Sequence, residues 1–565
     1  MVVSSVALSD SSFSPLDKSL ISPSNLRSII LGDPCQTWLK IHGKHYGFEQ
    51  DKDKYSLLEL IFDLGRRFED KWIREICPKG TKPVCSDPTK DLNAQMALKT
   101  LDLMDRGEKV IYQELIINPV EGLYGFPDLI CKKSWLAKKF SGIKPPEKGK
   151  DHYVILDIKY TRSLSNHDSE TMDYVKAQIR IYSYILAHLQ GYMPEEGYII
   201  CRGNVFEPIP VAIKSTLGQP IDQDIRDWCD AFIRIRDHGT EFTPFNDESL
   251  LPNFRVKMDE PWHSAKKEIG EQLFPGGPIN KLYRTTKTLE SKFKSLGFQG
   301  MSDLLEADVF DLPLSETQTS KIQRAILDAC QTGRASEVPP ELVPKKRTVE
   351  LFIDFEFFNG IDCDIEKDWP DYETKPMIFM AGVFWSENGK CHKRIITADS
   401  KTPEAEVELF KKFHRLLTKL GVFSDIENSA VYSWTDTEKR QMNATLSRLP
   451  EEIADDLSRI PWVDLMQPFI QGPIAIPGAF RYTLKEISVA IGKYDKEYAI
   501  EWPHEMTSGM GAMCAALEMY KNKKPLQTPE YELLSLYLEK DVQSLWKILC
   551  WLRSKGRRGK FVKVK

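Results

Sequence analysis

The sequence lacks the features of a membrane or secreted protein. No apolar run approaches the roughly 20 residues that a membrane-spanning helix requires. The first residues, MVVSSVALSDSSFSPLDK, have no basic leader ahead of an apolar stretch, and such a leader is the mark of a secretion signal. We therefore expect a cytoplasmic protein without a membrane partner.

Cysteine is present but does not form a metal-binding or cluster-binding motif. The 11 cysteines are spread over the chain, and no two lie closer than Cys77 and Cys85. This spacing excludes a C-x-x-C zinc knuckle and the short run of an iron–sulfur site. We expect reduced, mostly buried cysteines and no iron–sulfur cluster.

Two further absences narrow the function. No G-x-x-x-x-G-K-S or G-x-x-x-x-G-K-T phosphate loop occurs, so the sequence does not predict an autonomous helicase. A formal net charge of -5 argues against a protein that coats nucleic acid indiscriminately, but carboxylates that bind metal ions add negative charge without excluding a nucleic-acid enzyme. Unwinding would need a partner, such as a helicase or a protein of DNA repair or defence.

Positive charge gathers at the carboxyl end, in LRSKGRRGKFVKVK, with no acidic residue between the basic ones. We take Arg557, Arg558 and Lys560 as candidate phosphate contacts; a solvated tail is the alternative.

The length of 565 residues is too great for one core and indicates several domains. Hydrophobic periodicity predicts two α/β regions separated by a helical segment. In the first region we expect helices at 57–76 and 173–189, with strands at 109–118, 125–132 and 153–160. The predicted divisions are a flexible segment 1–22, an α/β domain 23–245, a connector 246–344, an α/β domain 345–552 and a basic tail 553–565.

The connector contains two amphipathic segments around the turn LGFQG, within residues 280–332. This pattern resembles a helix-hairpin-helix element, in which a glycine-containing turn offers backbone N–H groups to phosphates. A plain helical spacer is the alternative.

The first α/β region carries acids and a lysine at strand spacing. Asp128 lies in GLYGFPDLI, and Asp157 and Lys159 lie two residues apart in VILDIKYTRS, so they face the same way on a strand. Two acids and a lysine on adjacent strands suit metal-dependent phosphodiester cleavage. Gln178 and Tyr182 follow on one face of the next helix.

These residues resemble the PD-(D/E)xK nuclease superfamily and its RecB-like branch, with its G-x-x-D, D-x-K and Q-x-x-x-Y motifs in this order. The resemblance implies a restriction-endonuclease-like fold, with Asp128 and Asp157 as ligands of Mg²⁺ or Mn²⁺ and Lys159, Gln178 and Tyr182 as catalytic groups. A further acid on the first helix completes such sites; Glu69 is the best match, with Asp70 and Glu59 as alternatives.

The second α/β region opens with VELFIDFEFF, a buried strand interrupted by Asp354 and Glu356. Both acids face one way, and burying two charges is costly unless a cation pairs with them. LYLEKDVQSLW adds Tyr537 and Asp541 on one helical face. The candidates for a further acid are Glu438 and its rival Asp436, and Asp464.

This array resembles the DEDDy exonucleases of the RNase H-like fold. The resemblance implies that Asp354, Glu356 and Asp541 bind two metal ions about 4 Å apart, and that Tyr537 orients the attacking water. The family carries aspartate where this chain has Glu438, and Asp464 matches a secondary family aspartate.

The whole order, a RecB-like domain followed by a connector and an RNase H-like domain, resembles a family of bacterial two-nuclease proteins. We expect an Mg²⁺- or Mn²⁺-dependent nuclease that cleaves DNA at the first site and trims 3′ ends at the second. The alternatives are a nucleic-acid-binding scaffold with one inactive domain and an exonuclease that acts on RNA.

Overall fold

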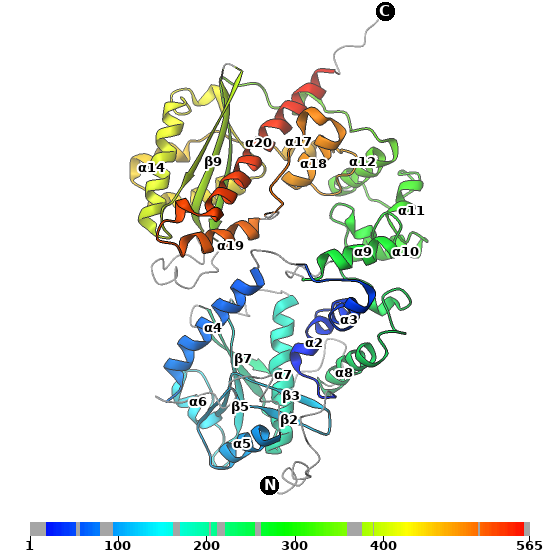
Figure 1. The fold of residues 1–565 in the computed structure, drawn as a ribbon, viewed down its shortest axis with the longest axis vertical. Helices are drawn as coiled ribbons and strands as arrows, with labels where there is room; N and C mark the ends of the chain where they lie inside the picture. The colour runs from blue at the N-terminus through cyan, green and yellow to red at the C-terminus, as the bar shows by residue number, and fades with distance from the viewer. Residues whose placement is uncertain are drawn as a thin grey trace, which may run out of the picture. The chain divides into compact units, whose positions relative to one another are not determined.

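The protein is α/β, and its contacts divide it into two compact units. Unit 1 comprises Met1–Asp51 and Ile61–Gly270, and unit 2 comprises Lys52–Leu60 and Glu271–Lys565. The computed structural model (Figure 1) describes residues 19–51, 57–78, 94–161, 170–202, 205–211, 221–254, 261–358, 376–387, 389–504, 506 and 509–558.

Unit 1 is built on a five-stranded mixed sheet in the order β1-β4-β5-β6-β7. Among its described strands, only the neighbours β5 and β6 are parallel, and the crossover between them contains helix α7 (Glu170–Gln190). A separate two-stranded sheet pairs β2 with β3. The strands are β1 (Val110–Tyr112), β2 (Ile116–Asn118), β3 (Leu123–Gly125), β4 (Leu129–Lys132), β5 (Tyr153–Ile158), β6 (Glu196–Cys201) and β7 (Val205–Pro210).

Successive side chains along the strands of unit 1 point to opposite faces of the sheet, so apolar residues form a core on each face. Ile130 and Ile155 pack with the buried face of α7. Their neighbours Leu129 and Leu156 pack with Phe68 of helix α4 (Leu57–Ile76). The other helices are α2 (Pro23–Ile30), α3 (Pro34–His42), α5 (Ala94–Asp105), α6 (Lys133–Lys139), α8 (Ile221–His238) and α9 (His263–Leu273).

The two predicted helices are present as α4 and α7, but the predicted strands are shorter. The predicted strand 109–118 is divided into β1 and β2 because Gln113 has a φ of 48°, in the left-handed region. Asp128 lies just before β4 and Lys159 just after β5, so the prediction that both lie within strands is wrong.

Unit 2 contains a second five-stranded mixed sheet, in the order β10-β9-β8-β11-β12. The pairs β10/β9 and β9/β8 are antiparallel, and β8/β11 and β11/β12 are parallel. The strands are β8 (Val349–Phe358), β9 (Met377–Glu387), β10 (Lys390–Thr397), β11 (Ser429–Ser433) and β12 (Trp462–Asp464).

Successive residues of the central strand β8 point to opposite faces of the sheet and so contribute alternately to two cores. Ile353 and Phe355 pack in the core that includes Phe410 of helix α14 (Pro403–Lys419). Phe352 packs in the core that includes Val542 of helix α20 (Pro529–Arg558). The remaining helices that follow β11 are α15 (Thr437–Thr445), α16 (Glu451–Ser458), α17 (Gln467–Gln471), α18 (Leu484–Tyr494) and α19 (Gly509–Tyr520).

Three helices from the predicted connector share a core with the second α/β region. They are α10 (Lys287–Ser295), α11 (Met301–Glu306) and α12 (Gln318–Thr332). Phe293 and Ile326 from these helices belong to the same apolar cluster as Leu549 and Trp551 of α20. This segment is therefore part of the packing of unit 2.

The LGFQG turn between α10 and α11 uses its backbone N–H groups within the protein. Asp303 Oδ2 accepts from the N–H groups of Gln299 (2.6 Å) and Gly300 (3.0 Å). The N–H of Gly297 donates to Lys294 O (3.0 Å), and that of Phe298 to Phe293 O (3.1 Å). Because these donors are paired internally, the structure favours the helical spacer over a phosphate-binding hairpin.

The basic end is only partly described. Helix α20 extends to Arg558, and Arg553 is half-buried and pairs with Glu350, so this residue belongs to the folded unit. The side chains of Arg557 and Arg558, and all of Lys560, lie outside the described residues. Among the described helices, none combines the length and apolar character needed to cross a membrane.

Candidate active sites

Asp128, Asp157 and Lys159 come together where β4 begins and β5 ends. The backbone N–H of Asp128 donates to Asp157 Oδ1 (3.1 Å), and that of Ile158 donates to Asp128 Oδ2 (2.7 Å). Lys159 Nζ lies 2.9 Å from Asp157 Oδ2 and 3.7 Å from Asp128 Oδ2. The pairing of β4 with β5 thus places two carboxylates and an ammonium group in contact.

Burial and mutual charge perturb this group. Burial and the charge of Asp157 raise the pKa of Asp128 well above its ordinary value. Burial lowers the pKa of Lys159, but Asp128 and Asp157 outweigh it and hold that pKa well above the ordinary value. Lys159 is therefore a fixed cation whose charge offsets the two acids.

Glu69 of α4 faces the same group. Its Oε1 accepts hydrogen bonds from Gln113 Nε2 (2.7 Å) and Tyr112 Oη (3.4 Å). Burial raises the pKa of Glu69, and Lys159 opposes that rise. The adjacent Asp70 is exposed, which favours Glu69 as the acid of the first helix. The side chain of the other alternative, Glu59, lies outside the described residues.

Gln178 and Tyr182 lie one turn apart on α7, and Gln178 Nε2 donates to Tyr182 Oη (3.0 Å). The Tyr182 ring lies against Gly125: a Cβ at Gly125 would come within 2.3 Å of Tyr182 Cε1. The position of the Tyr182 ring therefore requires glycine at position 125, which links the G-x-x-D motif to the Q-x-x-x-Y motif.

In unit 2, Asp354, Glu356 and Asp541 converge more tightly. One carboxylate oxygen from each lies within 4.8 Å of the others. Within the described ranges, this is the one group of three or more histidine, cysteine or acidic side chains that meets that distance; Glu69, Asp128 and Asp157 do not. Hard carboxylate oxygens are the ligands that Mg²⁺ and Mn²⁺ prefer.

A glycine allows α20 to reach this strand face. Gly382 of β9 pairs with Asp354 of β8. A Cβ at Gly382 would lie 2.8 Å from Leu538 Cγ and 3.1 Å from Val542 Cγ1. Because no side chain intervenes there, α20 packs directly on the sheet and brings Asp541 to the two strand acids.

Glu438 is the further acid that the structure brings to the cluster. It lies at the start of α15, is buried, and is hydrogen-bonded to Asp354. Its rival Asp436 points to solvent and pairs with Arg440 at 3.2 Å. Asp464 accepts from Met466 N (2.8 Å) and Gln467 Nε2 (2.9 Å), as a group that shapes the strand end.

The acids of unit 2 hold protons more tightly than exposed carboxyls do. Burial, followed by the charge of Glu438, raises the pKa of Asp354 well above its ordinary value. Burial also raises the pKa of Glu356, and it raises those of Asp541 and Glu438 to about 7 each. Such a cluster gains most from a cation placed among its oxygens.

Tyr537, one turn before Asp541, is buried beside the cluster. Two further residues, which the sequence patterns did not single out, contact it or Asp541. Lys485 Nζ of α18 donates to Tyr537 Oη (2.8 Å), and Trp502 Nε1 donates to Asp541 Oδ1 (2.8 Å). The only sequence signal for Lys485 is its position in YTLKEIS, and none marks Trp502.

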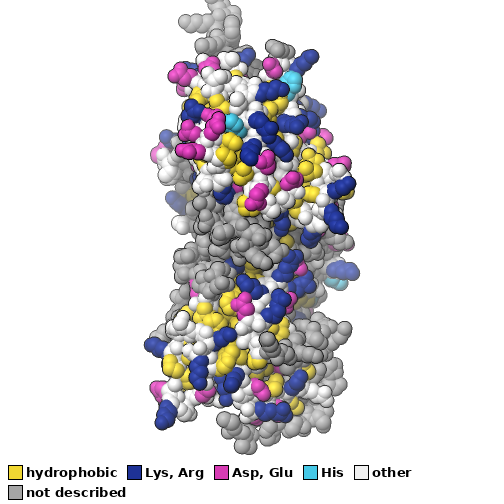
Figure 2. Space-filling view, turned by 90° about the vertical axis from the view of Figure 1, so that its left-hand side faces the viewer, with side chains coloured by type: hydrophobic (Ala, Val, Ile, Leu, Met, Phe, Trp, Pro, Cys, Tyr) yellow, Lys and Arg dark blue, Asp and Glu magenta, His cyan; other side chains and the backbone are white. Residues whose placement is uncertain are grey.

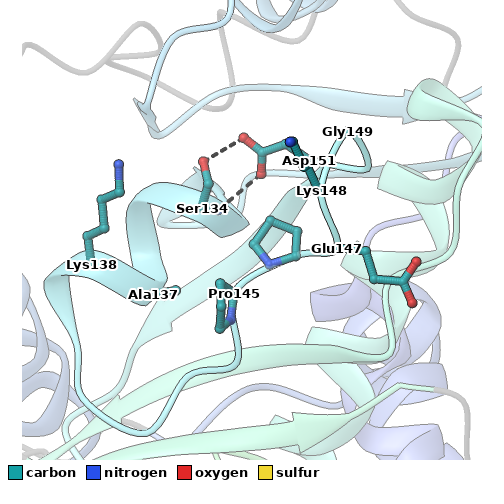
Figure 3. A pocket seen from close by; sticks show the side chains of 9 residues that line it. Ser134, Ala137, Lys138, Pro145, Glu147, Lys148, Gly149 and Asp151 are labelled. Atoms are coloured by element: carbon teal, nitrogen blue, oxygen red, sulfur yellow. Dashed lines mark hydrogen bonds between the residues drawn. The ribbon is translucent and has the colours of Figure 1, made fainter.

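A surface pocket of about 470 Å³ lies between α6 and the segment 145–151 (Figure 3). It includes Ser134, whose hydroxyl donates to Asp151 Oδ2. These residues lie at the ends of β4 and β5 opposite to Asp128 and Asp157, so the pocket is separate from the acid group.

No protein-family model matches this chain, and no curated protein matches it significantly.

Proposed function

We propose that the protein is a metal-dependent nuclease with two active sites. The observation that carries this proposal is the convergence of Asp354, Glu356 and Asp541 within 4.8 Å, with Tyr537 buried one helical turn away. The central position of β8 in a mixed sheet is compatible with the RNase H-like fold that the D-x-E and Y-x-x-x-D motifs suggest.

At the second site, Asp354, Glu356 and Asp541 would hold Mg²⁺ or Mn²⁺, and Glu438 would add a fourth carboxylate. Metal ions in such sites supply Lewis-acid stabilisation of the attacking and leaving oxygens and an activated water. Tyr537 would orient the attacking water through its hydroxyl. Trimming of 3′ ends is the activity that this arrangement suits.

At the first site, Asp128, Asp157 and Glu69 would hold one ion. Lys159 offsets the negative charge that develops on the phosphate and helps to orient the nucleophile. Tyr182, hydrogen-bonded to Gln178 on α7, is close enough for the charges of Asp157 and Lys159 to act on it, so both residues would contribute to this site. This site would cleave DNA.

The surface is compatible with local rather than general binding of nucleic acid. On the face drawn in Figure 2, Lys and Arg side chains are interspersed with Asp and Glu. A substrate backbone on this face would therefore meet mixed charge and no continuous basic surface.

Metal binding and cleavage by the full chain test the proposal. Calorimetric titration with Mn²⁺ should show tight binding that Asp541→Asn weakens, while Asp436→Asn, which changes an exposed acid of the same unit, should leave it unchanged. End-labelled single-stranded and duplex DNA and RNA, incubated with Mn²⁺ or with EDTA, identify the substrate.

Absence of Mn²⁺ binding, or cleavage that persists in EDTA, would rule out the proposed function. Tight metal binding without cleavage of any of the four substrates would instead support the nucleic-acid-binding scaffold. Faster trimming of RNA than of DNA would make the second site an RNA exonuclease.

A further inference from the structure

Lys485 lies beside the second acid cluster although it belongs to none of the recognised motifs. It is the second residue of α18, and its side chain is half-buried against α20. Its Nζ donates to Tyr537 Oη at 2.8 Å and lies 4.0 Å from the centre of the tyrosine ring. A cation is therefore built into the site from a separate helix.

The lysine fixes the direction in which Tyr537 donates. An ammonium group has only donors, so the tyrosine oxygen is the acceptor in this contact. The hydroxyl proton of Tyr537 is then free to point to Asp541, with which Tyr537 is also hydrogen-bonded. Lys485, Tyr537 and Asp541 thus form a directed chain of hydrogen bonds.

The same ammonium group compensates the charge of the acids. Burial lowers the pKa of Lys485, and the charges of Asp541, Glu356 and Asp354 oppose that fall. Lys485 in turn favours the ionised form of each of these acids. Three carboxylates within 4.8 Å repel one another strongly in a buried site, so a nearby cation stabilises the metal-free fold.

We infer that Lys485 is a positioning residue that serves as the internal counter-ion of this cluster: it directs the Tyr537 hydroxyl and offsets the carboxylates until divalent ions take over that role. The inference rests on the proposed metal site. It implies that Lys485 weakens metal affinity while it supports turnover, because its charge opposes an incoming cation.

Lys485→Met in the full chain separates these two effects. We expect the affinity for Mn²⁺, measured by calorimetry, to rise at least about tenfold, because a positive charge near the ions is removed. The rate of 3′ trimming at saturating Mn²⁺ should fall about tenfold or more, because the tyrosine loses its orienting donor. A variant that merely misfolds would bind Mn²⁺ less tightly.

Matched variants complete the test. Lys493→Met makes the same change at an exposed position on α18 and should behave as wild type. Lys485→Arg keeps the charge and should retain wild-type affinity. Lys485→Gln keeps a donor without the charge and should bind Mn²⁺ more tightly, so the result does not depend on the folding of the methionine variant.

A double-mutant cycle tests whether Lys485 supports trimming through its hydrogen bond to Tyr537. In a Tyr537→Phe background, Lys485→Met should cause little further loss of trimming, because both changes break one chain of hydrogen bonds.

If wild type does not bind Mn²⁺, the proposed function itself fails. If wild type binds Mn²⁺ but the two neutral variants bind it equally or less tightly, or if the trimming losses are additive, the inference about Lys485 is overturned and the metal site stands.

Discussion

The two candidate sites use the same kinds of side chain in different ways. In unit 1, Lys159 contacts two carboxylates directly, at 2.9 and 3.7 Å, and backbone N–H groups donate to Asp157 Oδ1 and Asp128 Oδ2. In unit 2, three carboxylates converge within 4.8 Å, and Lys485 contacts Tyr537 at 2.8 Å.

This difference shows how the charge of each site is balanced. The first site contains its own neutralising cation, Lys159, in contact with both acids, so an ion bound there as proposed would compete with Lys159 for them. The second site leaves its acids facing one another, so a divalent ion brings the greater gain in stability there. We therefore expect unit 2 to be the stronger metal-binding unit.

The largest expected effect comes from breaking each site separately. Asp354→Asn should reduce 3′ trimming by about 10³-fold, because metal-ion stabilisation of the transition state is worth several kcal/mol. Lys159→Ala should reduce cleavage at the first site and leave trimming intact. Product ladders from end-labelled substrates measure both activities. Equal loss of both activities in either variant would show that the sites are not independent.

The dependence of metal binding on pH should sharpen the comparison. In the metal-free protein, the raised pKa values of Asp541 and Glu438, each about 7, make the folded state bind more protons than the unfolded chain between about pH 4 and pH 7. Stability therefore falls as the pH rises through this window. Mn²⁺ bound among these acids should restore the stability, because the cation pairs with their ionised forms.

We expect Mn²⁺ to raise the melting temperature of unit 2 more at pH 8 than at pH 6, with the affinity increasing up to about tenfold per pH unit for each proton released. Differential scanning calorimetry measures this shift. Asp541→Asn serves as the control and should lose most of it. A shift that is larger at pH 6 would contradict the assignment.

Each site also depends on one glycine, and replacing either of these two glycines should have an effect of intermediate size. Gly382→Ala and Gly125→Ala should each destabilise the protein by about 1–3 kcal/mol, because the added Cβ collides with Leu538 or with Tyr182. The first change should also weaken Mn²⁺ binding, since it displaces the helix that carries Asp541. Chemical denaturation and Mn²⁺ titration of the two variants test this expectation. Gly389→Ala is unsuitable as a control, because the φ of 76° at Gly389 is strained for alanine.

The smallest effect concerns an acid outside both sites. Burial raises the pKa of Glu114 in unit 1 to about 8, and Thr100 donates to its Oε2 at 3.2 Å. The folded state therefore binds more protons than the unfolded chain between about pH 4.5 and pH 8, and stability falls across that window. Glu114→Gln should reduce this pH-dependent loss of unfolding free energy by roughly 1–2 kcal/mol.

Denaturation of wild type and Glu114→Gln at pH 5 and pH 8 tests this expectation. The response should be the same with and without Mn²⁺, unlike that of the acid cluster in unit 2. An unchanged pH dependence in the variant would contradict the burial of a protonated Glu114.

Local patterns in the sequence predicted much of the site and less of its surroundings. The spacing of Asp354 and Glu356 predicted a shared strand face, and the periodicity predicted α4 and α7, because both depend on neighbouring residues. Trp502 and Lys485 could not be found in this way, since their contacts depend on how α18 and the following segment pack against α20. The left-handed conformation of Gln113 is equally invisible, because glutamine seldom adopts it.

The connector shows the same limit at the level of domains. The sequence predicted a connector between two domains, but Phe293 and Ile326 pack in the same core as Leu549 and Trp551 of α20, and only the tertiary structure shows this.

This shared core has a practical consequence for anyone who expresses the second α/β region alone. A recombinant fragment that starts at residue 345 would lack α10–α12, which pack with Leu549 and Trp551. It would therefore expose an apolar patch that favours aggregation. The division between the units at Glu271 falls inside α9 (His263–Leu273), so a fragment that begins before α9 keeps this helix and α10–α12 intact.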